Sequence, residues 1–148
     1  MEQMKIKKEK IIDWLLNGDV SIRWQTMRDL TDESQKKGRE FLLCHKLFRS
    51  HRTGEIVDPK ITRLSFPPRW RYDIMRALDY FRECKAPTDR RMIDAIELIQ
   101  KKKTRDGRWK LQNKHPGKAF FELEQVGQLS RWNTLRALRI LSWWNKSR

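Results

Sequence analysis

The sequence predicts an all-α fold built from repeated helical hairpins. An eight-residue phrase occurs three times, at Arg23–Leu30, Arg71–Leu78 and Arg131–Leu138. Each copy reads Arg, aromatic, any residue, Thr or Ile, Met or Leu, Arg, any residue, Leu. The copies start 48 and 60 residues apart, which is a spacing typical of stacked helical repeats. Apolar residues elsewhere recur at helical spacing, and no strand pattern competes with them.

The first hairpin is expected over residues 1–32. Its first helix spans residues 5–17, with Gly18 placed as a C-terminal cap. Asp19 or Ser21 can cap a second helix at about 20–31, which carries the first phrase.

The second unit is expected over residues 33–86. A helix at 33–50 presents one apolar face made of Phe41, Cys44, His45 and Phe48. An extended apolar stretch at 64–68 ends in two prolines, and a helix at 69–84 then carries the second phrase.

The third unit is expected over residues 87–148. Asp89 caps a helix at about 90–102, with Met92, Ile93, Ile96 and Ile99 facing inward. A long irregular loop at 103–129 follows, in which residues 120–124 form a short strand or extended arm. Ser130 caps the last helix, 131–144, which carries the third phrase. All three units together make one helical-repeat domain over residues 1–148.

The composition favours an anionic partner. The chain has 34 Lys and Arg residues against 19 Asp and Glu residues, a formal charge of +15. Such an excess suits nucleic acid, an acidic membrane surface or a phosphorylated ligand. The alternative is that the surplus lysines only solvate helix faces.

The cysteines and the hydropathy favour a cytoplasmic protein. Cys44 and Cys84 are scattered and form neither a CxxC motif nor a disulfide framework, as expected in a reducing compartment. The Lys-rich N-terminus lacks the apolar core of a signal peptide. No apolar run reaches the roughly 18 residues of a transmembrane helix.

Several stretches resemble bacterial proteins of the squalene-cyclase and prenyltransferase-like group. They are His45–Arg52, Ser65–Trp70 and the region from Asp106 to Trp144. Asp106-Gly107-Arg108-Trp109 looks like the tail of the family repeat Gln-x-x-x-Gly-x-Trp, although Lys103 stands where the family has Gln. The resemblance implies an open arc of helical hairpins, similar to part of an α/α-toroid.

The family's catalytic functions do not carry over to this chain. The Asp-x-Asp-Asp motif of the cyclases is absent. The prenyltransferase zinc set is also absent, because the adjacent Cys44 and His45 point about 100° apart on a helix and cannot share one ion. The chain resembles the two ends of a toroid joined near Asp32–Gly38, and its exposed ends predict a homo-oligomer.

The repeat phrase suggests a ligand or partner site on an Arg- and aromatic-lined concave face. An aromatic residue and an Arg one turn later share a helix face and can form a cation–π pair. Alternatively the aromatic residues are core and the arginines reach the rim. An anionic or isoprenoid-like ligand, or a protein partner, would meet these candidates: Arg69, Trp70, Arg71, Tyr72, Asp73, Trp109, Arg131 and Trp132.

A nucleic-acid interface is the second hypothesis, because cations and tryptophans alternate in the C-terminal half. Its candidates are Lys101, Lys102, Lys103, Arg105, Arg108 and Lys110. No RNA-recognition, zinc-finger or helix-turn-helix signature accompanies them.

An enzyme of unknown reaction is the third hypothesis, although the missing motifs favour a non-catalytic protein. Glu122, Glu124 and His115 are weak acid–base candidates, and Glu124 can instead form an ion pair with Arg131. Walker A and GxGxxG loops are absent, so we expect no nucleotide cofactor, and no residue spacing suggests a metal.

Overall fold

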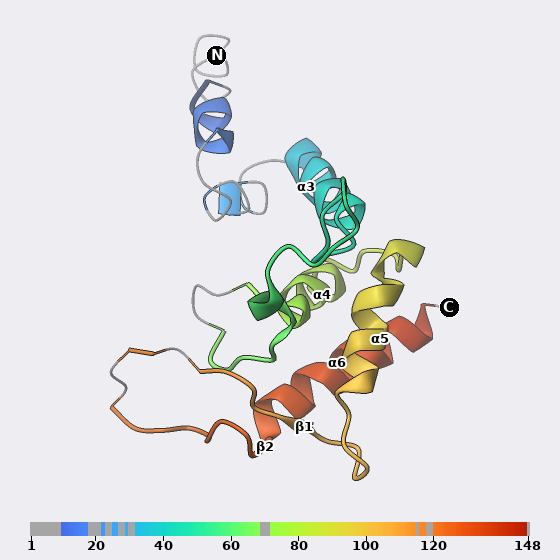
Figure 1. Cartoon of the computed structure of the whole chain (residues 1–148). Coiled ribbons are helices and arrows are strands. Elements are labelled where there is room, and N and C mark those ends of the chain that lie inside the picture. Colours follow the sequence, from blue (N-terminus) through green and yellow to red (C-terminus); the bar gives the residue numbers. More distant parts are fainter. Residues whose placement is uncertain are drawn as a thin grey trace. The chain divides into compact units, whose positions relative to one another are not determined.

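The chain forms two compact units, Met1–Phe41 and Leu42–Arg148. The computed structural model (Figure 1) describes residues 10–17, 22, 25–26, 29, 32–68, 72–114, 116–117 and 120–147. In the first unit, residues 10–16 are helical, which confirms the described part of the helix predicted at 5–17. Gly18, Asp19, Ser21 and most of the helix predicted at 20–31 lie outside the described residues.

Helix α3 (Asp32–Cys44) ends earlier than the predicted boundary at residue 50. Lys46 and Leu47 have positive φ values of 45° and 70°, a conformation that an α-helix cannot continue through. The chain then turns back on itself, and Arg49 forms a bridge with Ile56.

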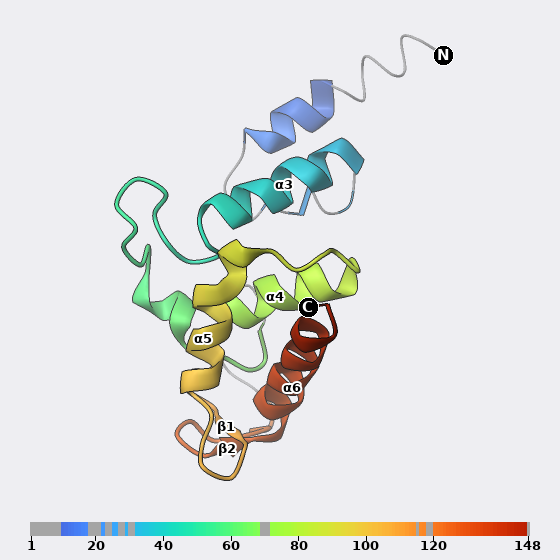
Figure 2. The same cartoon turned by 90° about the vertical axis from the view of Figure 1, so that its right-hand side faces the viewer.

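Three helices enclose the core of the second unit: α4 (Ile74–Glu83), α5 (Ile93–Lys101) and α6 (Arg131–Lys146). Helix α6 packs against α4 and against strand β1 (Trp109–Lys110), as Figures 1 and 2 show. The largest fully buried apolar side chains of this unit are Trp109, Phe81, Leu64, Ile74, Met75, Leu78, Met92, Ile99, Leu111 and Ile140.

Side-chain caps fix where the helices begin. Ser130 accepts a hydrogen bond from the backbone of Asn133, so its predicted role at the start of α6 is confirmed. Asp89 caps a short 3-10 helix, η2 (Arg90–Met92), that leads directly into α5. Asp73 caps α4, which therefore begins at Ile74 and not at residue 69.

The prediction of an all-α repeat fold is wrong. Strand β1 pairs with strand β2 (Leu129–Ser130) in a two-stranded antiparallel sheet, so the described residues combine helices with a sheet. The sheet forms because Trp109 and Leu111 are buried outside any helix. Their backbone N–H and C=O groups need hydrogen-bond partners there, and the residues before α6 supply them. A short strand or extended arm was expected at residues 120–124, but these residues have no strand structure. Strand β2 lies later in the chain, at residues 129–130.

An extended segment, Leu64–Phe66, of which Leu64 and Ser65 are buried, runs beside residues 112–113. It follows a 3-10 helix, η1 (Pro59–Thr62), and Ser65 forms a parallel bridge with Asn113. The backbone of Leu64 exchanges hydrogen bonds with Gln112, whose amide oxygen accepts from the Leu64 N–H at 3.1 Å.

Polar side chains from α4 and α6 complete the bonding of this segment. Asp73 accepts from the Ser65 N–H at 3.3 Å, and Arg136 donates to the Ser65 carbonyl at 3.0 Å. Asn133 donates to the Leu64 carbonyl at 3.2 Å. These three side chains come from the second and third copies of the repeat phrase, so the phrase serves to hold Leu64–Phe66.

Asp73 and Arg136 also form a buried ion pair across the α4–α6 contact. Arg136 Nη2 lies 3.3 Å from Asp73 Oδ1, and the two side chains are 9% and 0% exposed. Burial raises the pKa of Asp73, while Arg136 and the backbone donors at Arg76 and Ser65 oppose that rise.

We expect Asp73→Ala to destabilise the protein by about 2–4 kcal/mol, because it removes the α4 cap and the closer of the two carboxylates beside Arg136, leaving Asp79 at 3.6 Å. Asp73→Asn keeps an acceptor for the cap and should cost less. Denaturant unfolding measures both free energies of unfolding. Asp106→Ala is the control, since Asp106 pairs with Arg108 at the surface and should matter by no more than about 1 kcal/mol. Equal losses for Asp73→Ala and Asp106→Ala would contradict this account.

Candidate functional site

Four candidate residues lie outside the described residues. They are Arg69, Trp70 and Arg71 of the ligand-binding set and His115 of the catalytic set.

Three other ligand-binding candidates are enclosed within the second unit. The indole N–H of Trp109 donates to the Ile99 carbonyl at 2.7 Å, and its ring is fully buried. The Tyr72 hydroxyl donates to the Leu47 carbonyl at 2.9 Å. Asp73 is committed to Ser65, Arg76 and Arg136. These contacts give all three residues a structural role.

The last two candidates of that set, Arg131 and Trp132, are exposed in the first turn of α6. Trp132 is 45% exposed, and its ring stacks on Phe66 with centroids 4.8 Å apart and planes 6° from parallel. Arg136 lies one turn later but points into the core toward Asp73, so its charge is engaged by that carboxylate. Leu135 and Leu138, in contrast, are 39% and 50% exposed.

The nucleic-acid candidates share one compact feature, which we call the basic turn (residues 101–110). It connects α5 to β1 and projects past the end of α5 in both views (Figures 1 and 2). Hydrogen bonds between Thr104 and Arg108 close the turn, and Gly107 occupies a positive φ of 77° that favours glycine. The exposed cations of the turn are Lys101, Lys103, Arg105, Arg108 and Lys110.

Acidic side chains neutralise little of the basic turn. Asp106 is its single acid and pairs with Arg108 at 3.0 Å. Lys103 lies over the Trp109 ring at 5.9 Å, which is a cation–π contact. The remaining exposed cations of the turn have no ion pair with an acid among the described residues, so the turn presents a net positive surface.

Lys102 lies beside this surface, next to a further cation. Its ammonium donates to the Gln112 amide oxygen at 2.7 Å. Burial lowers the pKa of Lys102, and repulsion from the Arg63 guanidinium lowers it further. The exposed Arg63 therefore extends the positive surface toward the start of the Leu64–Phe66 segment.

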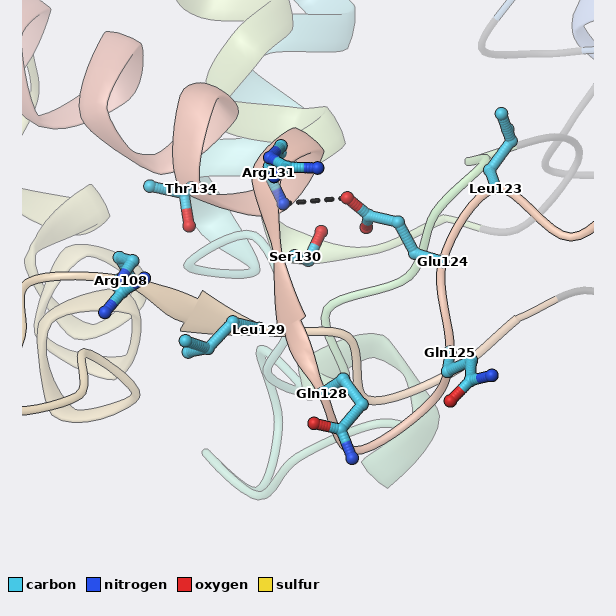
Figure 3. A pocket seen from close by; sticks show the side chains of 9 residues that line it. All are labelled: Arg108, Leu123, Glu124, Gln125, Gln128, Leu129, Ser130, Arg131 and Thr134. Atoms are coloured by element: carbon cyan, nitrogen blue, oxygen red, sulfur yellow. Dashed lines mark hydrogen bonds between the residues drawn. The ribbon is translucent and has the colours of Figure 1, made fainter.

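The two glutamates of the catalytic hypothesis have different surroundings. Glu124 Oε1 accepts from the backbone N–H groups of Arg131 at 2.7 Å and of Trp132 at 3.4 Å, so this carboxylate caps α6. Glu124, with Arg108 and Arg131, lines a hollow of about 420 Å³ beside β2 (Figure 3). Glu122 forms a surface ion pair with Lys114. The ion pair anticipated between Glu124 and Arg131 is replaced by this bond to the Arg131 backbone.

A second hollow, of about 470 Å³, lies between the start of α5 and the loop after α3. Asp94 lines it and is paired with Arg49 at 2.9 Å and with Lys46 at 3.5 Å. Among the described residues, no group of three or more His, Cys, Asp or Glu side chains could hold a metal ion. No helix in the described part of the chain is both long and apolar enough to span a bilayer.

Comparison with known proteins gives no relative, since no family model, curated protein or solved structure matches this chain.

Sequence reasoning did not single out Arg63 and Gln112 beside the positive surface, or Phe66 beside Trp132. Phe66 was visible only as part of an extended apolar stretch, and no local pattern links it to Trp132, which lies far along the chain. Arg63 and Gln112 carry no signal of their own, because their importance comes from the pairing of two distant segments.

Tyr72 makes a testable contribution to stability at alkaline pH. Burial raises the pKa of its phenol above the usual value of about 10, and the charge of Asp73 adds to that rise. The unfolded chain therefore loses this proton first, so the stabilisation present below pH 10 declines as the pH rises further.

We expect Tyr72→Phe to lower the free energy of unfolding by about 1 kcal/mol at pH 7, because the hydrogen bond to Leu47 is lost. The gap between wild type and variant should narrow above about pH 10. Urea unfolding from pH 7 to pH 11 measures it. All other titratable groups are common to both proteins, so a change of the gap with pH reports the titration of Tyr72. A gap that stays constant from pH 7 to pH 11 would contradict a raised pKa of Tyr72 in the folded protein.

Proposed function

We propose that the unit Leu42–Arg148 binds nucleic acid through the basic turn. The supporting observation is the set of exposed cations on residues 101–110, held by a hydrogen-bonded turn and accompanied by the single acid Asp106. Lys and Arg side chains that neutralise phosphates release condensed counterions, and this supplies much of the affinity for nucleic acid. The chain's formal charge of +15 adds long-range attraction.

This hypothesis now stands ahead of the Arg- and aromatic-lined ligand face. Trp109, Tyr72 and Asp73 of that face make structural contacts, whereas five of the six nucleic-acid candidates are exposed. We also propose a cytoplasmic location, because two scattered cysteines without a CxxC motif suit a reducing compartment.

The salt dependence of binding tests the proposal. We expect log K to fall linearly with log salt, with a slope of about −0.9 for each duplex phosphate contacted. Replacing Lys101, Lys103, Arg105 or Lys110 by Gln should each weaken binding across sequences and reduce the slope by about 1. Fluorescence anisotropy with a labelled oligonucleotide, at several salt concentrations, gives both quantities.

The control variants change the same charge elsewhere. Arg52→Gln, Lys85→Gln and Lys146→Gln each remove one exposed cation outside the basic turn. We expect them to leave the slope unchanged. Equal effects of the two sets would mean that only net charge matters, and a wild-type protein that binds no oligonucleotide would refute the proposal.

A second candidate function is association with a protein partner, in particular another copy of this chain, through the outer side of α6. Trp132, Leu135 and Leu138 are spaced three residues apart there and are 39–50% exposed. Exposed apolar side chains at such spacing suit a helix-mediated contact.

Native mass spectrometry tests this second function. We expect a dimer of the wild type whose dissociation constant rises at least about tenfold in Leu135→Gln and Leu138→Gln, since each change removes up to about 1.5–3 kcal/mol of apolar burial. Arg139→Gln, on the same helix, is the control for a change of surface polarity. A monomeric wild type at high concentration would contradict self-association.

A further inference from the structure

The Phe66–Trp132 stack is an aromatic surface that is ordered before any ligand binds. Trp132 belongs to the first turn of α6, which Ser130 and Glu124 both cap. Phe66 belongs to the segment that Asp73, Asn133 and Arg136 hold in place. Hydrogen bonds therefore position both rings, yet Trp132 remains 45% exposed.

A pair of cations lies at the other end of the same segment. Arg63 immediately precedes Leu64, and Lys102 is bonded to Gln112, whose amide oxygen also accepts from the Leu64 N–H. Neither cation has an ion pair with an acid among the described residues, and each raises the electrostatic energy of the other. A phosphate between them would relieve that repulsion.

The geometry of the segment sets the distance between these two features. Arg63 and Phe66 are three residues apart on extended backbone, which corresponds to about 10 Å at roughly 3.3 Å per residue. The α-carbons that carry the Arg63 cation and the Phe66 ring are thus separated by the length of about one or two nucleotides.

We propose that this surface takes single-stranded nucleic acid, with a phosphate between Arg63 and Lys102 and an unpaired base stacked on Trp132. The inference rests on the proposed function and specifies its ligand. Bases within a duplex are stacked on one another and cannot lie on a protein ring, whereas those of a single strand can. The basic turn then follows the backbone of the strand beyond Lys102.

The test compares an oligothymidylate with a duplex of equal length by fluorescence anisotropy. Trp132→Ala should weaken binding of the single strand by about 5- to 150-fold, the range expected for loss of one base–aromatic stack. Binding of the duplex should change less than about twofold. Trp132→Phe should retain most of the affinity, because phenylalanine still offers a ring face.

Two further variants separate stacking from folding and charge. Leu138→Ala removes an exposed apolar side chain from the same helix and should leave binding unchanged. Trp132→Leu keeps an apolar group against Phe66 and should bind the single strand as weakly as Trp132→Ala. Unchanged duplex binding by both variants excludes unfolding as the cause. Arg63→Gln should reduce the single-strand salt slope by about 0.7, whereas Arg52→Gln should not.

The outcomes distinguish this inference from the function on which it rests. Salt-dependent binding that prefers the duplex, or that is insensitive to Trp132→Ala, would overturn the single-strand inference and leave the basic turn as a nucleic-acid interface. Absence of binding to either oligonucleotide would overturn both.

Discussion

The extended segment Leu64–Phe66 is the constraint on which the second unit depends. Its backbone is enclosed, and only one side of it lies beside another extended stretch, residues 112–113. Unpaired backbone groups in a protein interior are costly, so side chains must complete the bonding. Asp73, Asn133 and Arg136 do so from two helices that are distant in sequence.

This arrangement gives the repeat phrase a physical meaning. Asp73 and Asn133 occupy the same position of the phrase, and each directs its side chain to the same backbone segment. Arg76 and Arg136 are likewise equivalent, and they donate to the carbonyl groups of Pro68 and Ser65. In the second and third copies, the polar residues at positions three and six of the phrase therefore bind the backbone of the chain that runs between α4 and α6.

The same segment connects the fold to the proposed site. Side-chain hydrogen bonds hold the backbone of Leu64 and Ser65. The same bonds therefore fix the positions of Arg63, which precedes these residues, and of Phe66, which follows them. Trp132 is held against Phe66 by the caps of α6, and Lys102 is held by Gln112. A binding surface formed in this way loses little conformational entropy when a ligand arrives.

Local signals in the sequence identified α5 and α6 well, whereas α3 ends before its predicted boundary and α4 begins after it. Asp89 and Ser130 begin helices as their cap chemistry predicts, and the inward Met92, Ile96 and Ile99 follow from helical spacing. The sheet was missed because each strand is only two residues long.

Long-range pairing could not be read from the sequence. Arg136 is buried and Leu138 is exposed, which reverses the usual preference of these two side chains. Arg136 is buried because the enclosed carbonyl of Ser65 needs a hydrogen-bond donor. The resemblance to cyclase-like proteins remains a prediction, since no family model matches the chain to test it.

The most direct test of the central claim is a titration of the ¹⁵N-labelled protein with an oligothymidylate, followed by backbone amide chemical shifts. The account predicts that the largest changes fall on residues 101–110, on Arg63–Phe66 and on Arg131–Trp132, while amides around Cys84 and Lys85 at the end of α4 stay unchanged. Changes confined to the end of α4, or spread evenly over the unit, would contradict it.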